Sequence, residues 1–258
     1  MLGFVIGDVV GSVYAFKPIK TKKFEFFDLN GRFTDDTVMA AGVNNVLKAY
    51  YAADKKLDFK AALQEEFLRI SWEYQDKDLA FSRFFSQWMF EDEPKPYGSA
   101  GILAASRAVP IGFWAKSLEE AQELGKLSAE ITHNHVEGIK GAQCAAGCVY
   151  LAKSGKSKEE VLAYAGKYYP FDFDLLGLRQ KYDYVPTCPM ALPPAIFCYA
   201  VSTDFEDAVR NTMYIGGADS MAAIAGALAE ATYGVPANLA DQVDAYLDDE
   251  IRAAFKKE

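Results

Sequence analysis

The side chains best suited to bind a metal ion are three consecutive oxygen donors, Thr34, Asp35 and Asp36. They follow a turn at Gly31 and open a segment with helical periodicity. Mg²⁺ and Mn²⁺ prefer carboxylate, hydroxyl and water oxygens in octahedral geometry, so this turn offers several suitable ligands. Acidic residues at a helix start also cap free amides at the positive end of the helix dipole, so this structural interpretation stays open.

A metal site built on this turn needs oxygen atoms from a second stretch of chain. The best candidate is the turn Gly216–Ser220, which precedes a run of small residues. Its two glycines permit close approach of another backbone, and Asp219 and Ser220 present oxygens from a second helix start. A capped helix without a ligand is again the alternative.

Other motifs for catalysis or ligand binding are weaker. The two histidines form the pattern His133-Asn134-His135, but no cysteine or third histidine accompanies them, so ligand contact or a structural hydrogen bond is favoured over a transition metal. Gly155-Lys156-Ser157 resembles the end of a phosphate-binding loop, yet Tyr150 stands where that loop requires glycine. No Gly-x-Ser-x-Gly nucleophile motif is present.

The elements that must position these residues are predicted to be helices. Apolar residues recur at helical spacing from Asp36 to Tyr50 and again from Leu239 to Phe255, where aspartates occupy the opposite face. Alanine-rich runs at 100–108, 138–153 and 221–233 are typical of closely packed helices.

Further signals indicate where helices start and where they approach each other. Capping boxes are predicted at Ser117–Glu120, Ser157–Glu160 and Thr203–Glu206, and a helix start at Pro193-Pro194. Gly3, Gly7 and Gly11 fall every four residues and predict a smooth helix face for close packing. Residues 22–29 are the best candidate for an extended segment. We predict an all-α, compact, single-domain orthogonal multi-helix fold over residues 1–258.

Composition narrows the classes of function. The chain has 258 residues, 51% of them hydrophobic, and a net charge of −9, which argues against nucleic-acid or anionic-membrane partners. No signal peptide or membrane span is recognisable, so a cytoplasmic protein is expected. The four cysteines lack a zinc-binding pattern and are expected to be buried thiols; they are Cys144, Cys148, Cys188 and Cys198.

Four blocks, in order along the chain, resemble those of the ADP-ribosylglycohydrolase family, relatives of the dinitrogenase-reductase-activating glycohydrolase. The blocks are Gly7–Phe16, Phe33–Thr37, Thr132–Ala142 and Gly216–Gly234. The resemblance implies an all-α fold with a central cleft, and two Mg²⁺ or Mn²⁺ ions that orient the ribose hydroxyls. It also implies hydrolysis of an N- or O-glycosidic bond between ADP-ribose and a protein side chain.

The resemblance also assigns roles to individual positions. It makes Asp35 and Asp36 the catalytic residues. The metal ligands it implies are Thr34, Asp35, Asp36, Asp219 and Ser220, and the residues that contact ADP-ribose are His133, Gly98, Ser99, Gly101 and Gly217.

This chain departs from the family pattern at three places. Ala15 stands where the first block usually has glutamate, and the loop Tyr97–Leu103 lacks the usual asparagine. The turn Gly216–Ser220 is one residue shorter than usual and lacks one carboxylate. Two dications repel each other strongly at short range, so we expect one bound ion, or two only at high concentration. A missing general acid or base typically lowers a rate by about 10²–10⁴-fold.

Three hypotheses follow from the sequence. The chain is a Mg²⁺-dependent hydrolase of ADP-ribosylated protein or a related conjugate, possessing full or weakened activity. Alternatively, it is a catalytically silent relative that binds ADP-ribose or a nucleotide, or a scaffold that keeps only the fold.

Overall fold

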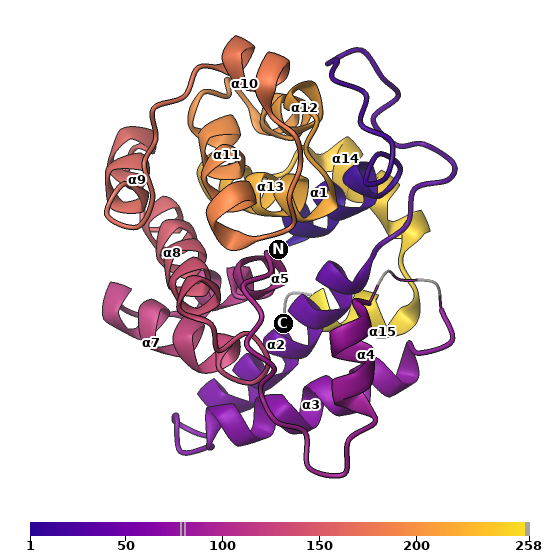
Figure 1. The fold of residues 1–258 in the computed structure, drawn as a ribbon, viewed down its shortest axis with the longest axis vertical. Helices are drawn as coiled ribbons and strands as arrows, with labels where there is room; N and C mark the ends of the chain where they lie inside the picture. The colour runs from indigo at the N-terminus through magenta and orange to yellow at the C-terminus, as the bar shows by residue number, and fades with distance from the viewer. Residues whose placement is uncertain (78, 80, 256–258) are drawn as a thin grey trace.

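The computed structural model describes residues 1–77, 79 and 81–255, and the regular structure of these residues is helical (Figure 1). In chain order the elements are α1 (Leu2–Ser12), α2 (Asp35–Ala52), α3 (Phe59–Glu73), α4 (Arg83–Met89), α5 (Leu103–Ser106), α6 (Val109–Trp114), α7 (Leu118–Ala129), α8 (Val136–Lys153), α9 (Lys158–Ala165), α10 (Leu175–Lys181), α11 (Cys188–Ala200), α12 (Phe205–Ile215), α13 (Asp219–Tyr233), α14 (Ala237–Val243), the 3-10 helix η1 (Asp244–Tyr246) and α15 (Asp249–Phe255). Within the described ranges, β-type pairing is limited to one isolated bridge between Gly101 and Thr187. The predicted all-α class is confirmed, and residues 22–29 are irregular rather than a strand.

Helices α1 and α13 lie antiparallel at the centre of the fold with their backbones nearly in contact (Figure 1). A Cβ atom on Gly7 would lie 2.0 Å from the carbonyl oxygen of Ala222, and one on Gly11 would lie 2.5 Å from the Cα of Asp219. One turn earlier in α1, a Cβ atom on Gly3 would lie 2.5 Å from the carbonyl oxygen of Gly226 in α13. The small-residue face predicted from the glycine spacing is therefore confirmed, and it places the start of α13 beside α1.

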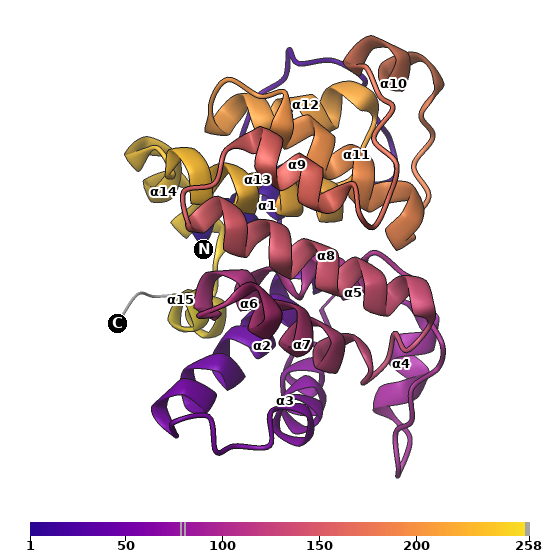
Figure 2. The same ribbon diagram turned by 90° about the vertical axis from the view of Figure 1, so that its left-hand side faces the viewer.

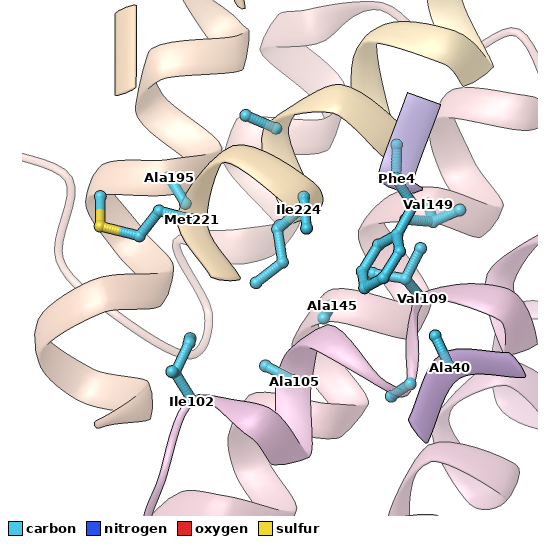
Figure 3. Close-up of a cluster of buried hydrophobic side chains, with 14 of the residues drawn as sticks. Phe4, Ala40, Ile102, Ala105, Val109, Ala145, Val149, Ala195, Met221 and Ile224 are labelled. Atoms are coloured by element: carbon cyan, nitrogen blue, oxygen red, sulfur yellow. The ribbon is translucent and has the colours of Figure 1, made fainter. Parts of the chain in front are cut away.

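The remaining helices enclose this pair in one hydrophobic core. Helix α8 crosses the molecule, with α5, α6 and α7 packed on one side and α9, α11 and α13 on the other (Figure 2). Apolar side chains from five of these elements meet in the interior, as Figure 3 shows for Phe4, Ala40, Val109, Val149 and Ile224. All four cysteines are buried free thiols, as predicted. None of the described helices is both long enough and apolar enough to cross a bilayer.

The capping signals predicted some helix starts and misplaced others. Ser157 and Glu160 form the complete capping box. Ser117 caps α7 as predicted, but the carboxylate of Glu120 accepts a hydrogen bond from the amide of Lys116 instead of closing the box. The Thr203 prediction is wrong by one residue, because Asp204 is the cap of α12 and accepts the hydrogen bond from the amide of Asp207.

Two other helix predictions need correction. Pro193 and Pro194 lie inside α11, which starts five residues earlier with another proline, Pro189, in its first turn. The C-terminal segment is not one helix, because Leu247 is extended and the carboxylate of Asp248 accepts a hydrogen bond from the amide of Ile251, starting α15 anew.

The contact between α1 and α13 predicts how two glycine substitutions differ. We expect Gly7→Ala to lower the free energy of unfolding by about 2–3 kcal/mol, because the added methyl group overlaps the backbone of α13. Gly166→Ala is the matched control, since Gly166 is right-handed and its Cβ neighbours would lie at 3.4 Å or beyond. The control should leave stability unchanged or raise it by about 0.5 kcal/mol. Urea denaturation tests this, and equal stability of the two variants would contradict the close contact.

Candidate functional site

Three carboxylates from distant parts of the chain converge in one place. One oxygen each from Asp8, Asp36 and Asp219 lies within 4.8 Å of the other two. Asp8 comes from the middle of α1, Asp36 from the first turn of α2, and Asp219 from the first residue of α13. Opposite ligands of a Mg²⁺ ion are about 4.2 Å apart, so the cluster has the dimensions of a cation site.

The carboxylate of Asp8 is fully buried and accepts three hydrogen bonds from the first turn of α2. The amide of Thr34 donates to Oδ2 at 2.8 Å, the hydroxyl of Thr34 donates to Oδ1 at 2.7 Å, and the hydroxyl of Thr37 donates to Oδ2 at 2.5 Å. Asp8 therefore joins α1 to α2. Our sequence analysis did not select it as a site residue; its one signal is a single charge within the apolar stretch 2–10.

Asp36 is held by hydroxyl groups on both sides. The hydroxyl of Ser220, in α13, donates to Oδ2 at 2.6 Å, and the hydroxyl of Ser106, in α5, donates to Oδ1. Thr34 caps α2 by accepting the amide of Asp36, so the capping and site interpretations of this turn both hold. Ser106 was not found from sequence, because no local pattern marks it.

The predicted residue Asp35 lies beside the cluster and outside the group of three converging oxygens. It is partly buried. Burial raises the pKa of Asp35 well above its usual value, and the charges of Asp36, Asp219 and Asp8 raise it further. Asp35 therefore adds a fourth carboxylate to the same electrostatic environment.

Burial raises the pKa of every carboxylate in the cluster, and repulsion by neighbouring carboxylates raises the pKa of Asp8 and Asp219 further. For Asp8 the largest cause is burial, followed by the charges of Asp36 and Asp219. Burial and the charge of Asp36 raise the pKa of Asp219 to about 7. Burial raises the pKa of Asp36 too, and its two serine donors oppose the shift. No lysine or arginine of the described chain is among the main causes of these shifts, and a proton or a bound cation is suited to balance the charge.

The predicted ADP-ribose contacts gather in a second group, which we call the shelf: the loop Tyr97–Gly101 packed against the turn Thr132–Asn134. The amide of Gly98, in the left-handed conformation at φ 71°, donates to Oδ1 of Asn134 at 2.8 Å. A Cβ on Gly101 would lie 3.1 Å from both Nε2 of His133 and the hydroxyl of Ser99. The structure thus brings Gly98, Ser99, Gly101 and His133 together.

His133 in the shelf is a neutral group. It is buried, and its Nδ1 shares a 2.8 Å hydrogen bond with the hydroxyl of Thr132. Burial, and secondarily the charge of Arg107, hold the pKa of His133 well below its usual value. Arg107 is itself buried and donates from Nη2 to the carbonyl of Ser128 at 2.6 Å. The ring therefore offers a hydrogen bond without a positive charge.

Two short connections tie the shelf to the carboxylates. Helix α5 follows the shelf loop directly and supplies Ser106 to Asp36. The segment before α11 lies along the same loop, since the amide of Cys188 donates to the carbonyl of Ala100 at 2.9 Å. That segment also contributes Tyr184, which the sequence analysis missed. Burial and then the charges of Asp219 and Asp36 raise the pKa of Tyr184, so its phenol borders the cluster.

Three further positions singled out from the sequence are Gly217, Ala218 and Ala15. Gly217 lies in the turn before α13, where its amide donates to the carbonyl of Thr212 at 2.8 Å, and no contact of it with the shelf is seen among the described residues. Ala218 is the N-cap residue of α13 and provides no side-chain oxygen there. Ala15 lies in the turn after α1.

Comparison with known proteins gives a consistent result. The family model described as ADP-ribosylglycohydrolase matches residues 1–257. The chain is 27% identical over 274 residues to the ADP-ribosylarginine hydrolase Tri1 of Pseudomonas putida (strain GB-1), covering 91% of this chain and 70% of that protein. It is 26% identical over 276 residues to the ADP-ribosyl-(dinitrogen reductase) glycohydrolase of Rhodospirillum rubrum, covering 97% and 91%.

A solved structure described as an ADP-ribosylglycohydrolase-related protein complex superposes with a TM-score of 0.70 at 21% identity. The alignment covers 98% of this chain and 94% of that chain. At this identity the likeness shows the fold alone.

The raised pKa of Asp219 predicts a pH-dependent stability in the absence of metal. Its folded-state pKa of about 7 exceeds the ordinary 3.8, so its contribution to stability is present below about pH 4 and is lost as the pH rises through 7. In EDTA, the free energy of unfolding of Asp219→Asn, relative to that of the wild type, should therefore rise by on the order of 3 kcal/mol when the pH is raised from 4 to 8. Denaturant titrations at several pH values measure this.

Asp172→Asn is the control for that experiment, because Asp172 is exposed in the segment between α9 and α10. The difference in free energy of unfolding between Asp172→Asn and the wild type should not change over the same pH range. If the free energy of unfolding of Asp219→Asn relative to the wild type stays constant from pH 4 to pH 8, Asp219 does not titrate in the folded cluster.

Proposed function

The chain belongs to the ADP-ribosylglycohydrolase family, and from that premise we propose that it hydrolyses the glycosidic bond joining ADP-ribose to a protein side chain. The single observation that carries the proposal is the convergence of Asp8, Asp36 and Asp219 beside the shelf. The curated relatives are named for arginine-linked ADP-ribose and for ADP-ribosyl-(dinitrogen reductase), which supports a modified protein as the substrate.

We further propose that the carboxylates hold one Mg²⁺ or Mn²⁺ ion in preference to two. A carboxylate has about four lone pairs, and those of Asp8 are largely used, since Oδ2 accepts two hydrogen bonds and Oδ1 accepts one. Asp36 keeps one lone pair on each oxygen beside its serine donors. Asp219 uses Oδ1 to accept the amide of Ser220 and keeps Oδ2 free. These lone pairs, together with that of Thr34, supply one ion, and waters complete its shell.

A bound cation would orient the substrate hydroxyls at the reacting sugar. The protein supplies the positioning. Asp36 is fixed by serines from α5 and α13, so its oxygens are already oriented before a ligand arrives. Neutral His133 and the Gly98–Gly101 loop offer hydrogen bonds and close backbone approach to ADP-ribose without adding charge.

A catalytically silent ADP-ribose-binding protein is the second candidate function. Two positions in the sequence support it. By the family resemblance, Ala15 stands where the first block usually has glutamate, and Ala218 lies in a turn that usually carries a second carboxylate. The shelf and the hydroxyl donors to Asp36 remain, so binding of the ligand does not depend on the residues that changed.

Release of ADP-ribose from modified protein decides between these functions. With Mg²⁺ or Mn²⁺, the wild-type protein should release ADP-ribose from an arginine-linked or serine-linked substrate, and Asp36→Asn should lower the rate by about 10²-fold or more. Asp172→Asn, far from the cluster in sequence and exposed, should leave the rate unchanged. Calorimetric binding of ADP-ribose without turnover would support the silent binder, and neither binding nor turnover would contradict both candidates.

Restoring the missing carboxylate gives a separate prediction. If the reaction lacks a general acid or base because of Ala15, Ala15→Glu should raise the rate by about 10²-fold or more. Phe16→Glu is the matched control, because Phe16 is the adjacent residue and is 89% exposed. Equal effects of the two variants on the rate of ADP-ribose release would contradict a specific role for position 15.

A further inference from the structure

A cavity of about 1010 Å³ lies at the end of the α1–α13 pair opposite the carboxylate cluster. It is bounded by the start of α1, the end of α13, and helices α6, α14 and α15; Figure 2 shows the amino terminus between α14 and α15. The 15 residues of α13 separate the two ends by about 22 Å. None of the carboxylate or shelf residues lines this cavity. Its volume is at the upper end of the range for small-molecule sites.

One wall of the cavity is aromatic and held in place. The indole Nε1 of Trp114 donates to Oδ1 of Asn44 at 2.7 Å, and the indole ring stacks on Tyr51 with centroids 5.3 Å apart. The side-chain Nδ2 of Asn44 in turn donates to the carbonyl of Ala254 at 2.7 Å, linking α2 to α15. Because a hydrogen bond to Asn44 and stacking on Tyr51 both hold the indole ring of Trp114, this wall is formed before a ligand binds. Phe255 adds a second aromatic ring to the lining.

Most charged groups of the lining are paired within the protein. Glu230 binds the amino group of Met1 at 2.9 Å and the amide of Gly3 at 2.7 Å. Arg252 binds Asp244 at 2.8 Å. These pairs leave no net charge of their own on the cavity wall.

Two lysines of the lining have no acidic partner among the described residues. The ammonium group of Lys48 donates to the carbonyl of Ala253 at 3.2 Å, and that of Lys153 donates to the carbonyl of Phe113. Lys116 adds a third positive charge near Lys153. These lysines give the cavity rim positive charge without a carboxylate partner in the described part of the chain, and this charge provides complementarity for an anion.

We propose that this cavity binds an amphipathic anion, with its apolar chain or ring system against Trp114 and Phe255 and its carboxylate or phosphate at the rim that Lys48 and Lys153 provide. The apolar body supplies affinity through burial, and the two lysines select a negative headgroup over a neutral one. This binding site is separate from the site of the proposed hydrolysis and does not depend on it.

Calorimetry on the full chain tests the proposal with three ligands of equal chain length: dodecanoate, dodecyl phosphate and neutral dodecanol. We expect one or both anions to bind with Kd below about 100 μM, and dodecanol to bind at least about tenfold more weakly. The two anions distinguish a carboxylate from a phosphate headgroup. Absence of binding by both anions, or equal binding of dodecanol, would overturn the proposal.

Variants locate the binding event. Lys48→Gln/Lys153→Gln should weaken anion binding about five- to tenfold and leave dodecanol unchanged. The double control Lys56→Gln/Lys181→Gln removes the same charge from exposed lysines outside the cavity and should have no such effect. Ala240→Phe, which fills the cavity from α14, should abolish binding, and Asp36→Asn should not alter it. Equal effects of the two lysine pairs, or unchanged binding in a folded Ala240→Phe protein, would overturn the site.

Discussion

The carboxylate cluster depends on how closely α1 approaches its two neighbours. Because Gly7 and Gly11 have no side chains, α13 can lie against the backbone of α1, which places Asp219 beside Asp8. On its other side, Asp8 accepts hydrogen bonds from Thr34 and fixes the first turn of α2. One helix therefore sets both distances that the site requires. A side chain at either glycine would move α13 away and separate the carboxylates without altering any of them.

The cluster also shows how the fold holds several acidic groups whose hydrogen-bond donors, among the described residues, are hydroxyls and backbone amides. The donors are hydroxyl and amide groups from the start of α2, from α5 and from α13, and each donor satisfies an oxygen without neutralising its charge. Hydrogen bonds of this kind lower the pKa of a carboxylate, whereas burial and like charges raise it, and here the raising effects prevail. A dication bound among these carboxylates would favour their charged forms. Groups arranged for a ligand in this way commonly mark functional sites.

The sequence predicts those site residues that neighbouring residues in the chain mark as helix starts. It does not predict the site residues whose hydrogen-bond partners lie far away in the chain. The turn at Thr34–Asp36 has a capping residue before a periodic segment, and the turn Gly216–Ser220 has two glycines before a run of small residues, so both could be predicted to start helices. Asp8 is one charge in an apolar helix, and nothing in residues 2–12 shows that its partners are hydroxyls of α2. Ser106 and Tyr184 have no pattern at all, because tertiary packing alone brings them to the carboxylates.

The start of α13 gives the carboxylate of Asp219 two roles. Ala218 is the N-cap residue and has no side-chain oxygen, so the orphan amide of Ser220 is satisfied by Oδ1 of Asp219 itself. Asp219 therefore caps its own helix and faces Asp36 with the same carboxylate. Ser106 and Ser220 hold both oxygens of Asp36 by hydrogen bonds, so the carboxylate opposite Asp219 is fixed in position. The start of α13 therefore places one carboxylate against a neighbour that other elements have already oriented.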